Sequence, residues 1–334
     1  MNIVVTSIFD PTLGTKTIAE KLATSGGRLW LIGDCKGPFT CNLPNTEFWP
    51  IEKQRQLDFA LAANLPEKHY ARKNLGYLLA IQAGAPCIVE TDDDNIPEEE
   101  FWTPRHPEIN AHFYRKKGWV NAYTHFSARR IWPRGLPLDC IHSFQPSAAE
   151  PATTVEAFIQ QGLADENPDV DAIYRLVSDL PFRFENRTPL ALGPGAWCPF
   201  NSQNTTFFKE AFPLLYLPSY CTFRMTDIWR SFVAQRCLWE MSSVVAFTSA
   251  TVRQERNVHD LMRDFADEIP GYLKNADICA ALQSMPLQSG RNASAVTENL
   301  TTCYAALVEL EVFPEKEMRL VENWCRDVLR LVQS

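Results

Sequence analysis

Several features that assign a chain to a common protein class are missing from this sequence of 334 residues. No apolar run is long enough to span a bilayer, and the first residues lack the basic region and cleavage site of a signal peptide. The 10 cysteines never show the C-x₂-C spacing of zinc sites, which favours buried, reduced thiols. A net charge of −8 argues against a broad nucleic-acid surface. These absences predict a cytoplasmic protein with no transmembrane segment and no nucleic-acid partner.

Common nucleotide-binding and hydrolase motifs are also absent. The run Gly14–Thr17 follows a predicted strand but does not match the P-loop pattern. Gly193 and Gly195 lack the third glycine and the strand–helix context of a dinucleotide fingerprint. Neither H-E-x-x-H nor G-x-S-x-G occurs, so nothing indicates a zinc peptidase or a serine hydrolase.

The most informative feature present is an apolar strand that ends in three aspartates. Residues 88–95 read Ile-Val-Glu-Thr-Asp-Asp-Asp-Asn, so Asp92, Asp93 and Asp94 follow one another. Adjacent carboxylates repel, and a fold tolerates them mainly where a cation or N–H donors neutralise them. Carboxylate oxygens suit Mg²⁺ or Mn²⁺ that also binds substrate phosphates. The alternative is a solvated acidic turn, and the motif alone does not decide between the two.

Strand and helix patterns alternate over the first 95 residues, which predicts an α/β fold with a largely parallel sheet. In such sheets, ligands bind at the carboxyl ends of the strands. After residue 97 the pattern loosens into connections rich in proline and aromatic residues. The predicted strands are 2–8, 28–32, 88–91, 119–123, 201–208 and 243–248, and the predicted helices are 16–25, 52–64, 68–83, 226–241, 258–268, 276–283, 300–312 and 314–332.

Basic and amide side chains gather just before the acidic strand and again after it. Arg72, Lys73 and Asn74 open the preceding helix, where they would hold a diphosphate or form a solvated helix start. Arg134 lies between Trp-Pro and Gly, which indicates a fixed cation. The polar run 201–204 begins a predicted strand, where ligand hydrogen bonding explains it better than a core does.

Two further residues have an ordinary structural alternative. Asp227 lies at the start of a predicted helix, where a capping role is the default. His259 follows a charged run close after the last predicted strand, and a lone histidine is more often structural than a ligand.

Read together, these segments resemble the STELLO-like group of glycosyltransferases. More distantly, the chain is similar to the reversibly glycosylated polypeptides, which are UDP-arabinopyranose mutases. Six ordered motifs between about residues 70 and 260 carry the first resemblance: Lys73–Tyr77, Glu90–Asn95, Trp132–Pro137, Asp169–Leu176, Pro199–Thr205 and Phe223–Arg230.

The resemblance implies a GT-A-type, Rossmann-like fold with a mixed, mostly parallel sheet flanked by helices. It implies a catalytic domain over residues 1–255, with a nucleotide-sugar half at about 1–125 and an acceptor half at about 126–255. Residues 256–334 would be a helical C-terminal extension, which the motifs do not cover.

The resemblance also implies the donor site. Asp92 and Asp94, completed by His259, would bind Mn²⁺ or Mg²⁺, which neutralises the leaving nucleoside diphosphate. The residues expected to bind the nucleotide sugar are Thr6, Asp34, Arg72, Lys73, Asn74, Asp92, Asp93, Asn201 and Gln203.

Asp227 and Arg134 are the expected catalytic residues. Asp227 would face the acceptor and take its hydroxyl proton. Arg134 matches the arginine that carries the sugar in the mutase family, although a phosphate or carboxylate clamp is simpler. The leading expectation is a metal-dependent transferase that moves a sugar from a nucleotide-diphosphate sugar to a glycan or other hydroxyl acceptor. The alternatives are a mutase that works through Arg134 and a non-catalytic scaffold of a polysaccharide-synthesis complex, with which the protein would associate peripherally.

Overall fold

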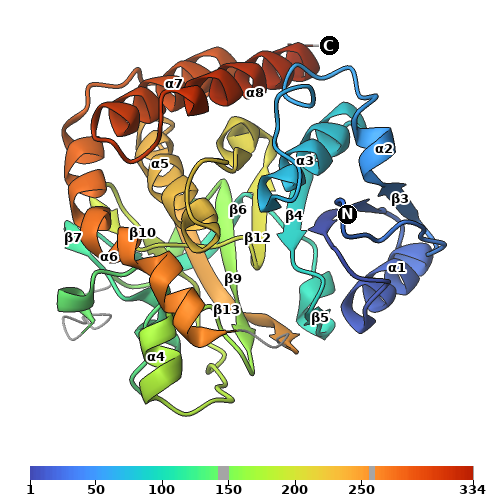
Figure 1. Cartoon of the computed structure of the whole chain (residues 1–334). Coiled ribbons are helices and arrows are strands. Elements are labelled where there is room, and N and C mark those ends of the chain that lie inside the picture. Colours follow the sequence, from blue (N-terminus) through green and yellow to red (C-terminus); the bar gives the residue numbers. More distant parts are fainter. Residues whose placement is uncertain (142–149, 256–259, 334) are drawn as a thin grey trace.

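One mixed sheet runs through the middle of the molecule, with helices on both of its faces (Figure 1). The computed structural model describes residues 1–141, 150–255 and 260–333. The order of the main sheet is β3-β2-β1-β4-β12-β9-β13-β10-β6-β8, with β5 paired to β13, while β11 and β7 form a separate pair. The strands are β1 (Asn2–Thr6), β2 (Arg28–Ile32), β3 (Thr46–Trp49), β4 (Cys87–Thr91), β5 (Asn95–Pro97), β6 (Glu108–Tyr114), β7 (Gly118–Trp119), β8 (Thr153–Glu156), β9 (Ile159–Asp165), β10 (Leu190–Leu192), β11 (Ala196–Trp197), β12 (Asn204–Phe208) and β13 (Val245–Gln254). The predicted fold class is confirmed.

The helices and short 3₁₀ turns fill the connections between these strands. The α-helices are α1 (Leu13–Ser25), α2 (Ile51–Gln54), α3 (Lys73–Gln82), α4 (Ala172–Val177), α5 (Thr226–Glu240), α6 (Leu261–Ser284), α7 (Ala293–Glu309) and α8 (Lys316–Gln333). The 3₁₀ turns are η1 (Tyr70–Arg72), η2 (Glu99–Trp102), η3 (Ala122–Phe126), η4 (Leu138–Cys140), η6 (Lys209–Leu215) and η7 (Phe223–Met225).

The N-terminal part is a parallel α/β unit, as the alternating patterns predict. β1 pairs in parallel with both β2 and β4, and the inner residues of the three strands are buried apolar side chains apart from Glu90 of β4. α3 lies flat against β1 because Gly76 has no side chain, and a Cβ there would come within 2.6 Å of Val4 Cγ1. This packing fixes the sheet edge at which β1 and β4 end.

β12 interrupts the parallel order and brings a second polar segment to that edge. It runs antiparallel between β4 and β9, with Asn204 opposite Thr91. The start of β12 therefore lies beside the end of β4, and the polar run 201–204 meets the three aspartates. Seven residues of β9 form the neighbouring central strand, which the sequence patterns did not predict.

Three predicted helices differ from the observed structure. Between residues 52 and 64, only the end of α2 is helical, so the predicted helix is wrong over most of its length. The two predicted helices at 258–268 and 276–283 are instead parts of one helix, α6, which includes Pro270.

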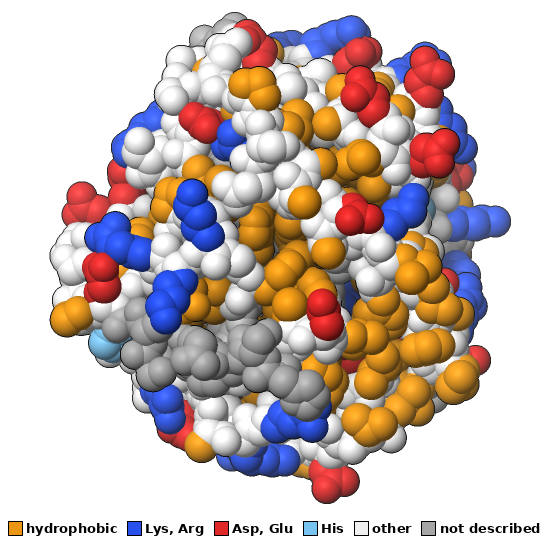
Figure 2. Space-filling view, turned by 90° about the vertical axis from the view of Figure 1, so that its left-hand side faces the viewer, with side chains coloured by type: hydrophobic (Ala, Val, Ile, Leu, Met, Phe, Trp, Pro, Cys, Tyr) orange, Lys and Arg blue, Asp and Glu red, His pale blue; other side chains and the backbone are white. Residues whose placement is uncertain are grey.

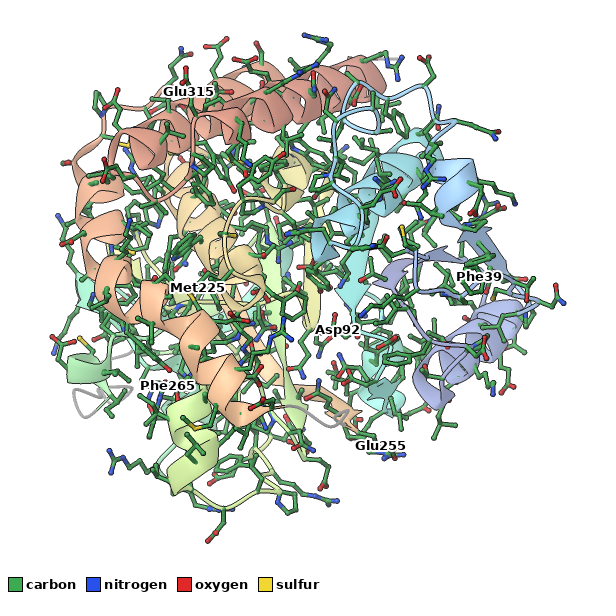
Figure 3. All side chains as sticks on the ribbon, in the orientation of Figure 1. Phe39, Asp92, Met225, Glu255, Phe265 and Glu315 are labelled. Carbon is green, nitrogen blue, oxygen red and sulfur yellow. The ribbon has the colours of Figure 1, made fainter. Side chains whose placement is uncertain are left out.

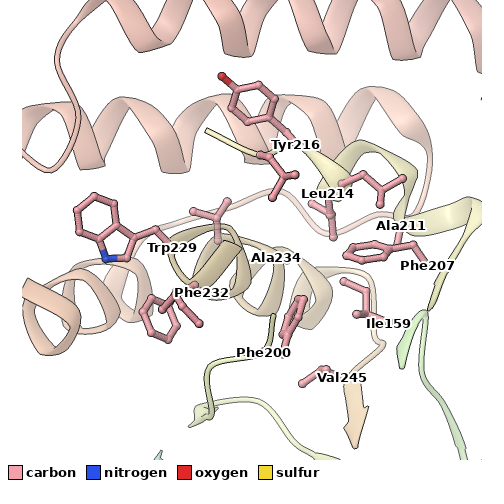
Figure 4. Packing of buried hydrophobic residues seen from close by; sticks show 14 of the residues in the cluster. Ile159, Phe200, Phe207, Ala211, Leu214, Tyr216, Trp229, Phe232, Ala234 and Val245 are labelled. Carbon is pink, nitrogen blue, oxygen red and sulfur yellow. The ribbon is translucent and has the colours of Figure 1, made fainter. Parts of the chain in front are cut away.

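The C-terminal helices share the hydrophobic core with the sheet (Figure 4). Trp229 and Phe232 of α5 pack in the same cluster as Ile159 of β9. The ring of Tyr216 lies 5.3 Å from that of Tyr304 in α7, centroid to centroid. The division at residue 255 that the resemblance implies stays a prediction.

The face shown in Figure 2 mixes charges of both signs, and hydrophobic side chains gather toward its centre and lower right. α4 and α6 lie on this side of the molecule in Figure 1 and expose Val177 and Leu273. Among the described helices, none combines the length and apolar character that crossing a bilayer requires.

Candidate functional site

A cavity of about 790 Å³ opens where β1, β2 and β4 end. Figure 3 shows Asp92 near the middle of the molecule, with Phe39 on one side and Met225 on the other. The cavity joins the N-terminal α/β unit to the residues just before β12 and to residues of α4, η7, α5, β13 and α6. Its charged lining residues are Asp34, Lys36, Lys68, Arg72, Asp92, Asp93, Asp94, Arg134, Asp169, Arg175, Arg224, Asp227, Arg263 and Asp267.

Each of the three consecutive aspartates has a partner of its own. Asp92 accepts hydrogen bonds from Lys73 Nζ (3.2 Å) and Tyr70 Oη (2.8 Å). Ser7 Oγ donates to Asp93 at 2.5 Å. Gln254 Nε2 lies 3.1 and 3.2 Å from the two carboxylate oxygens of Asp94. The protein therefore supplies part of the neutralisation that adjacent carboxylates require.

The loop that carries the aspartates is held from behind by α1. The Thr12 hydroxyl donates to the carbonyl of Asp93 and also caps α1 by accepting from Thr15 N–H. Gly14 lets the helix approach, because a Cβ there would overlap the carbonyl oxygens of Asp93 and Asn95. Burial raises the pKa of Asp93 to about 6, against the opposing effect of the Ser7 hydrogen bond.

Arg134 joins two buried aspartates at the other end of the cavity. Its Nε and Nη2 donate to Asp169 at 2.8 and 2.7 Å. Its Nη1 and Nη2 each donate to Asp227 at 3.0 Å, and Nη1 also donates to the carbonyl of Arg224. These contacts engage all five N–H groups of the guanidinium. Burial opposes the charge of Arg134, but Asp169 and Asp227 outweigh burial and raise its pKa further.

Asp227 is held as a carboxylate and is not a helix cap. Burial opposes its ionisation, but the charge and hydrogen bonds of Arg134 lower its pKa to about 2. The N–H and hydroxyl of Ser202 also lie 3.1 and 3.2 Å from it. The Ser202 hydroxyl is 2.6 Å from Tyr70 Oη, which donates to Asp92. Hydrogen bonds thus link the acidic strand end to the buried arginine.

Four other predicted donor-site residues also line the cavity: Thr6, Asp34, Arg72 and Gln203. The Asp34 carboxylate accepts from three backbone N–H groups, those of residues 35, 68 and 69, and so shapes the loop near the end of β2. Arg72 is buried and donates to the side chain of Gln54 at 2.8 Å.

Three predicted residues lie behind the cavity wall. Lys73 has no exposed surface and also donates to the carbonyls of Thr91 and Ser202. The amide of Asn74 both donates to and accepts from the backbone of Leu217. Asn201 accepts from the N–H of Gln203, two residues along. These contacts support the site from within, and His259 lies outside the described residues.

Several lining residues were not foreseen as site residues, among them Tyr70, Ser202, Phe223 and Arg263. Tyr70 lies two residues before the predicted Arg72, and Ser202 lies within the predicted polar run 201–204, so proximity in sequence was an available signal. Phe223 opens the last of the six motifs, whereas Arg263 carries no such signal, since basic residues are frequent on any surface.

The chemistry of the donor set fits a divalent cation only in part. Asp92 and Asp94 both present carboxylate oxygens to the cavity, as Mg²⁺ and Mn²⁺ prefer. Within the described ranges, no group of three or more His, Cys, Asp or Glu residues is arranged to hold a metal ion. Substrate phosphates would therefore have to complete the coordination.

The sheet, the acidic strand end and the polar cavity define an α/β protein of the GT-A-like type. Residues 224–333 match the family model described as STELLO glycosyltransferases. The chain is 30% identical over 337 residues to the Arabidopsis thaliana protein "Probable glycosyltransferase STELLO2", covering 94% of this chain and 43% of the relative. It is 31% identical over 262 residues to "Probable glycosyltransferase STELLO1" of the same plant, covering 72% and 34%. The chain belongs to the STELLO-like family and spans less than half the length of these relatives.

Proposed function

We propose that this chain is a glycosyltransferase that moves a sugar from a nucleotide-diphosphate sugar to a hydroxyl acceptor. The observation that carries the proposal is that one cavity is lined by the acidic strand end, by the ends of β1 and β2 and by the Arg134–Asp227 pair. Membership in the STELLO-like family supports the same class of reaction.

The donor would lie across the strand ends. Thr6 and Asp34 stand beside the expected nucleoside, and Asp92 and Asp94 would hold Mn²⁺ or Mg²⁺ against the diphosphate. The bound ion would supply electrostatic stabilisation of the leaving nucleoside diphosphate. Lys73 fixes Asp92 from below, so that this carboxylate is oriented before any ligand arrives.

Asp227 would act mainly by positioning the acceptor hydroxyl. With a pKa of about 2, its carboxylate is a weak base at neutral pH and removes a proton poorly in the ground state. It remains a hydrogen-bond acceptor that Arg134 and Ser202 hold in one orientation. The mutase alternative would need Arg134 as the sugar carrier, and its engaged N–H groups give no support to that role.

Calorimetric titration of uridine and guanosine diphosphates, each with Mn²⁺ and with Mg²⁺, tests the donor site. At least one diphosphate is expected to bind in a metal-dependent manner, and Asp94→Asn is expected to weaken it by about tenfold or more. Glu100→Gln is the matched control, because it removes one exposed negative charge from the same segment outside the cavity. If no diphosphate binds to the folded protein, the proposal fails.

The scaffold alternative is separated by the same variant. A scaffold would keep its cellular role in Asp94→Asn, whereas a metal-dependent transferase would lose it. Mass spectrometry after incubation with nucleotide sugars addresses the mutase. A covalent sugar adduct that Arg134→Ala abolishes would favour it over the transferase proposed here.

A further inference from the structure

One wall of the cavity is not used by the proposed donor site. Phe223 of η7 and Arg263 and Asp267 of α6 line it. In Figure 3, Met225 of η7 and Phe265 of α6 lie across Asp92 from Phe39, which is on the N-terminal side. This wall therefore faces the donor site from the C-terminal part of the chain.

Phe223 is an exposed aromatic residue on a rigid turn. Phe223 is 54% exposed, whereas the next two residues, Arg224 and Met225, are buried. The Thr222 hydroxyl donates to the carbonyl of Asp267 at 2.6 Å, and Arg224 forms an ion pair with Glu268 at 2.7 Å. These contacts hold the turn against α6. A single exposed apolar residue is ordinary on a protein surface. Phe223, however, lines a polar cavity and its backbone is held in place, so its ring is already positioned to contact a ligand.

The ring also contacts the donor side of the cavity. It meets the ring of Tyr70 edge to face, with the centroids 5.5 Å apart. Tyr70 in turn donates to Asp92. A ligand that covers the ring of Phe223 would therefore lie close to a sugar bound near Asp92.

Arg263 and Asp267 add polar groups to the same wall. They are one helical turn apart on α6, so their side chains point in similar directions. The hydrogen bonds that these two residues form with other elements use backbone atoms. For example, the backbone carbonyl of Asp267 accepts from the Thr222 hydroxyl. Over the described residues, no ion pair or hydrogen bond joins either side chain to another side chain. The guanidinium of Arg263 and the carboxylate of Asp267 can therefore form hydrogen bonds with a ligand that contacts the ring of Phe223.

We propose that Phe223, Arg263 and Asp267 form an acceptor subsite for a carbohydrate. The apolar C–H face of a sugar ring would stack on Phe223, and its hydroxyl groups would bond to Arg263 and Asp267. Among the residues of η7 and α6 that line the cavity, Phe223 is the one apolar side chain and is flanked by charges, whereas an acyl chain would need a larger apolar surface there. The inference rests on the proposed function and names the class of its acceptor.

Saturation-transfer NMR with a panel of neutral methyl glycosides and disaccharides tests the subsite. We expect at least one panel member to receive saturation at its ring C–H protons, both with and without bound nucleoside diphosphate. Phe223→Ala is expected to weaken that binding by about tenfold, and Phe223→Tyr to retain it. Phe39→Ala is the matched control, because Phe39 is 68% exposed but does not line the cavity.

Three results would overturn the inference. The first is that no glycoside binds to the wild-type protein. The second is that Phe223→Ala binds glycosides as the wild type does. The third is that Phe223→Ala weakens binding of the nucleoside diphosphate, which would mean that Phe223 stacks on the nucleotide base. Glycoside binding without diphosphate binding would instead remove the donor-site proposal and leave the subsite in place, so the two failures are distinguishable. Circular dichroism of each variant verifies its fold.

Discussion

From the contact between Arg134 and Asp227 we predict how the stability of the fold changes in acid. The folded protein lowers the pKa of Asp227 from its ordinary value of 3.8 to about 2. A lowered carboxylate pKa contributes stability above the unfolded value and loses it as pH falls toward the folded value. At 1.36 kcal/mol per pKa unit, this contribution is about 2 kcal/mol at neutral pH. Asp227→Asn should remove it.

Urea unfolding of the wild type and Asp227→Asn across a pH series measures this contribution. The variant is expected to be less stable by about 2 kcal/mol from pH 7 down to about pH 4. The gap should shrink to about one third by about pH 2.5, where Asp227 begins to be protonated in the folded wild type. Glu100→Gln, which changes an exposed carboxylate, should leave the curve unmoved.

A gap between the two unfolding curves that stays constant with pH would refute the reasoning. It would mean that Asp227 stabilises the fold through packing or neutral hydrogen bonds and not through its charge beside Arg134. The reasoning would also fail if the variant were as stable as the wild type at neutral pH.

Three further perturbations test the framework of the site. Burial raises the pKa of Asp171 from 3.8 to about 6, so wild-type stability should fall by about 2 kcal/mol as pH rises from about 4 to 6; Asp171→Asn should lack this fall in urea unfolding, and equal slopes would contradict it. Gly135→Ala should lower the unfolding free energy by about 2 kcal/mol, because Gly135 has φ of 89° and its added Cβ would lie 2.5 Å from Ile228 Cγ2; an unchanged thermal midpoint would count against this packing. Glu90→Gln should lower the unfolding free energy by about 3 kcal/mol, since it leaves the buried charge of Arg230 without its partner at 2.6 Å. Calorimetric unfolding measures this loss, and a loss no larger than that of a typical surface substitution would contradict the prediction.

Local patterns predicted the N-terminal half of the fold well. β1, β2 and α3 follow from runs of buried apolar residues and from helical spacing, because each element satisfies its own backbone and buries one face. The three aspartates at the end of β4 and the polar run before β12 were likewise visible as polar residues where an apolar strand begins or ends. Both proved to face the same cavity or to support its wall.

The errors arise where distant residues decide the local structure. Leu57, Leu61 and Leu65 have helical spacing and pack in or against the core, but the chain there forms turns. Asp327 of α8, more than 260 residues away, accepts from the N–H groups of Ala60 and Leu61 and so replaces helical hydrogen bonds. A pattern of buried residues reports which side chains face the core, and not which backbone conformation places them there.

The meeting of Arg134, Asp169 and Asp227 illustrates the same limit within the site. These residues lie 35 and 93 positions apart, in a loop, a turn before α4 and the first turn of α5. Each alone had an ordinary explanation as a fixed cation or a helix cap. They meet because α5 packs against the segment between β9 and α4, and such long-range packing does not follow from local propensity.

The C-terminal helices support the wall of the cavity that carries Phe223 and Arg224. Glu317 of α8 is buried and accepts from Tyr216 Oη and from the N–H groups of Ser219 and Tyr220, in the segment that leads to Phe223. Glu268 of α6 binds Arg224, whose carbonyl accepts from Arg134.

The family match begins at residue 224 and runs through these helices, so it covers Asp227 and the elements that support it but not the three aspartates. What this chain shares with that family model therefore includes Arg224, Asp227 and the cavity-lining residues of α6, together with the helices that support them. A substitution that frees α6 or α8 should thus disturb the geometry at Asp227 before it disturbs Asp92, which Lys73 and Tyr70 hold from the N-terminal side.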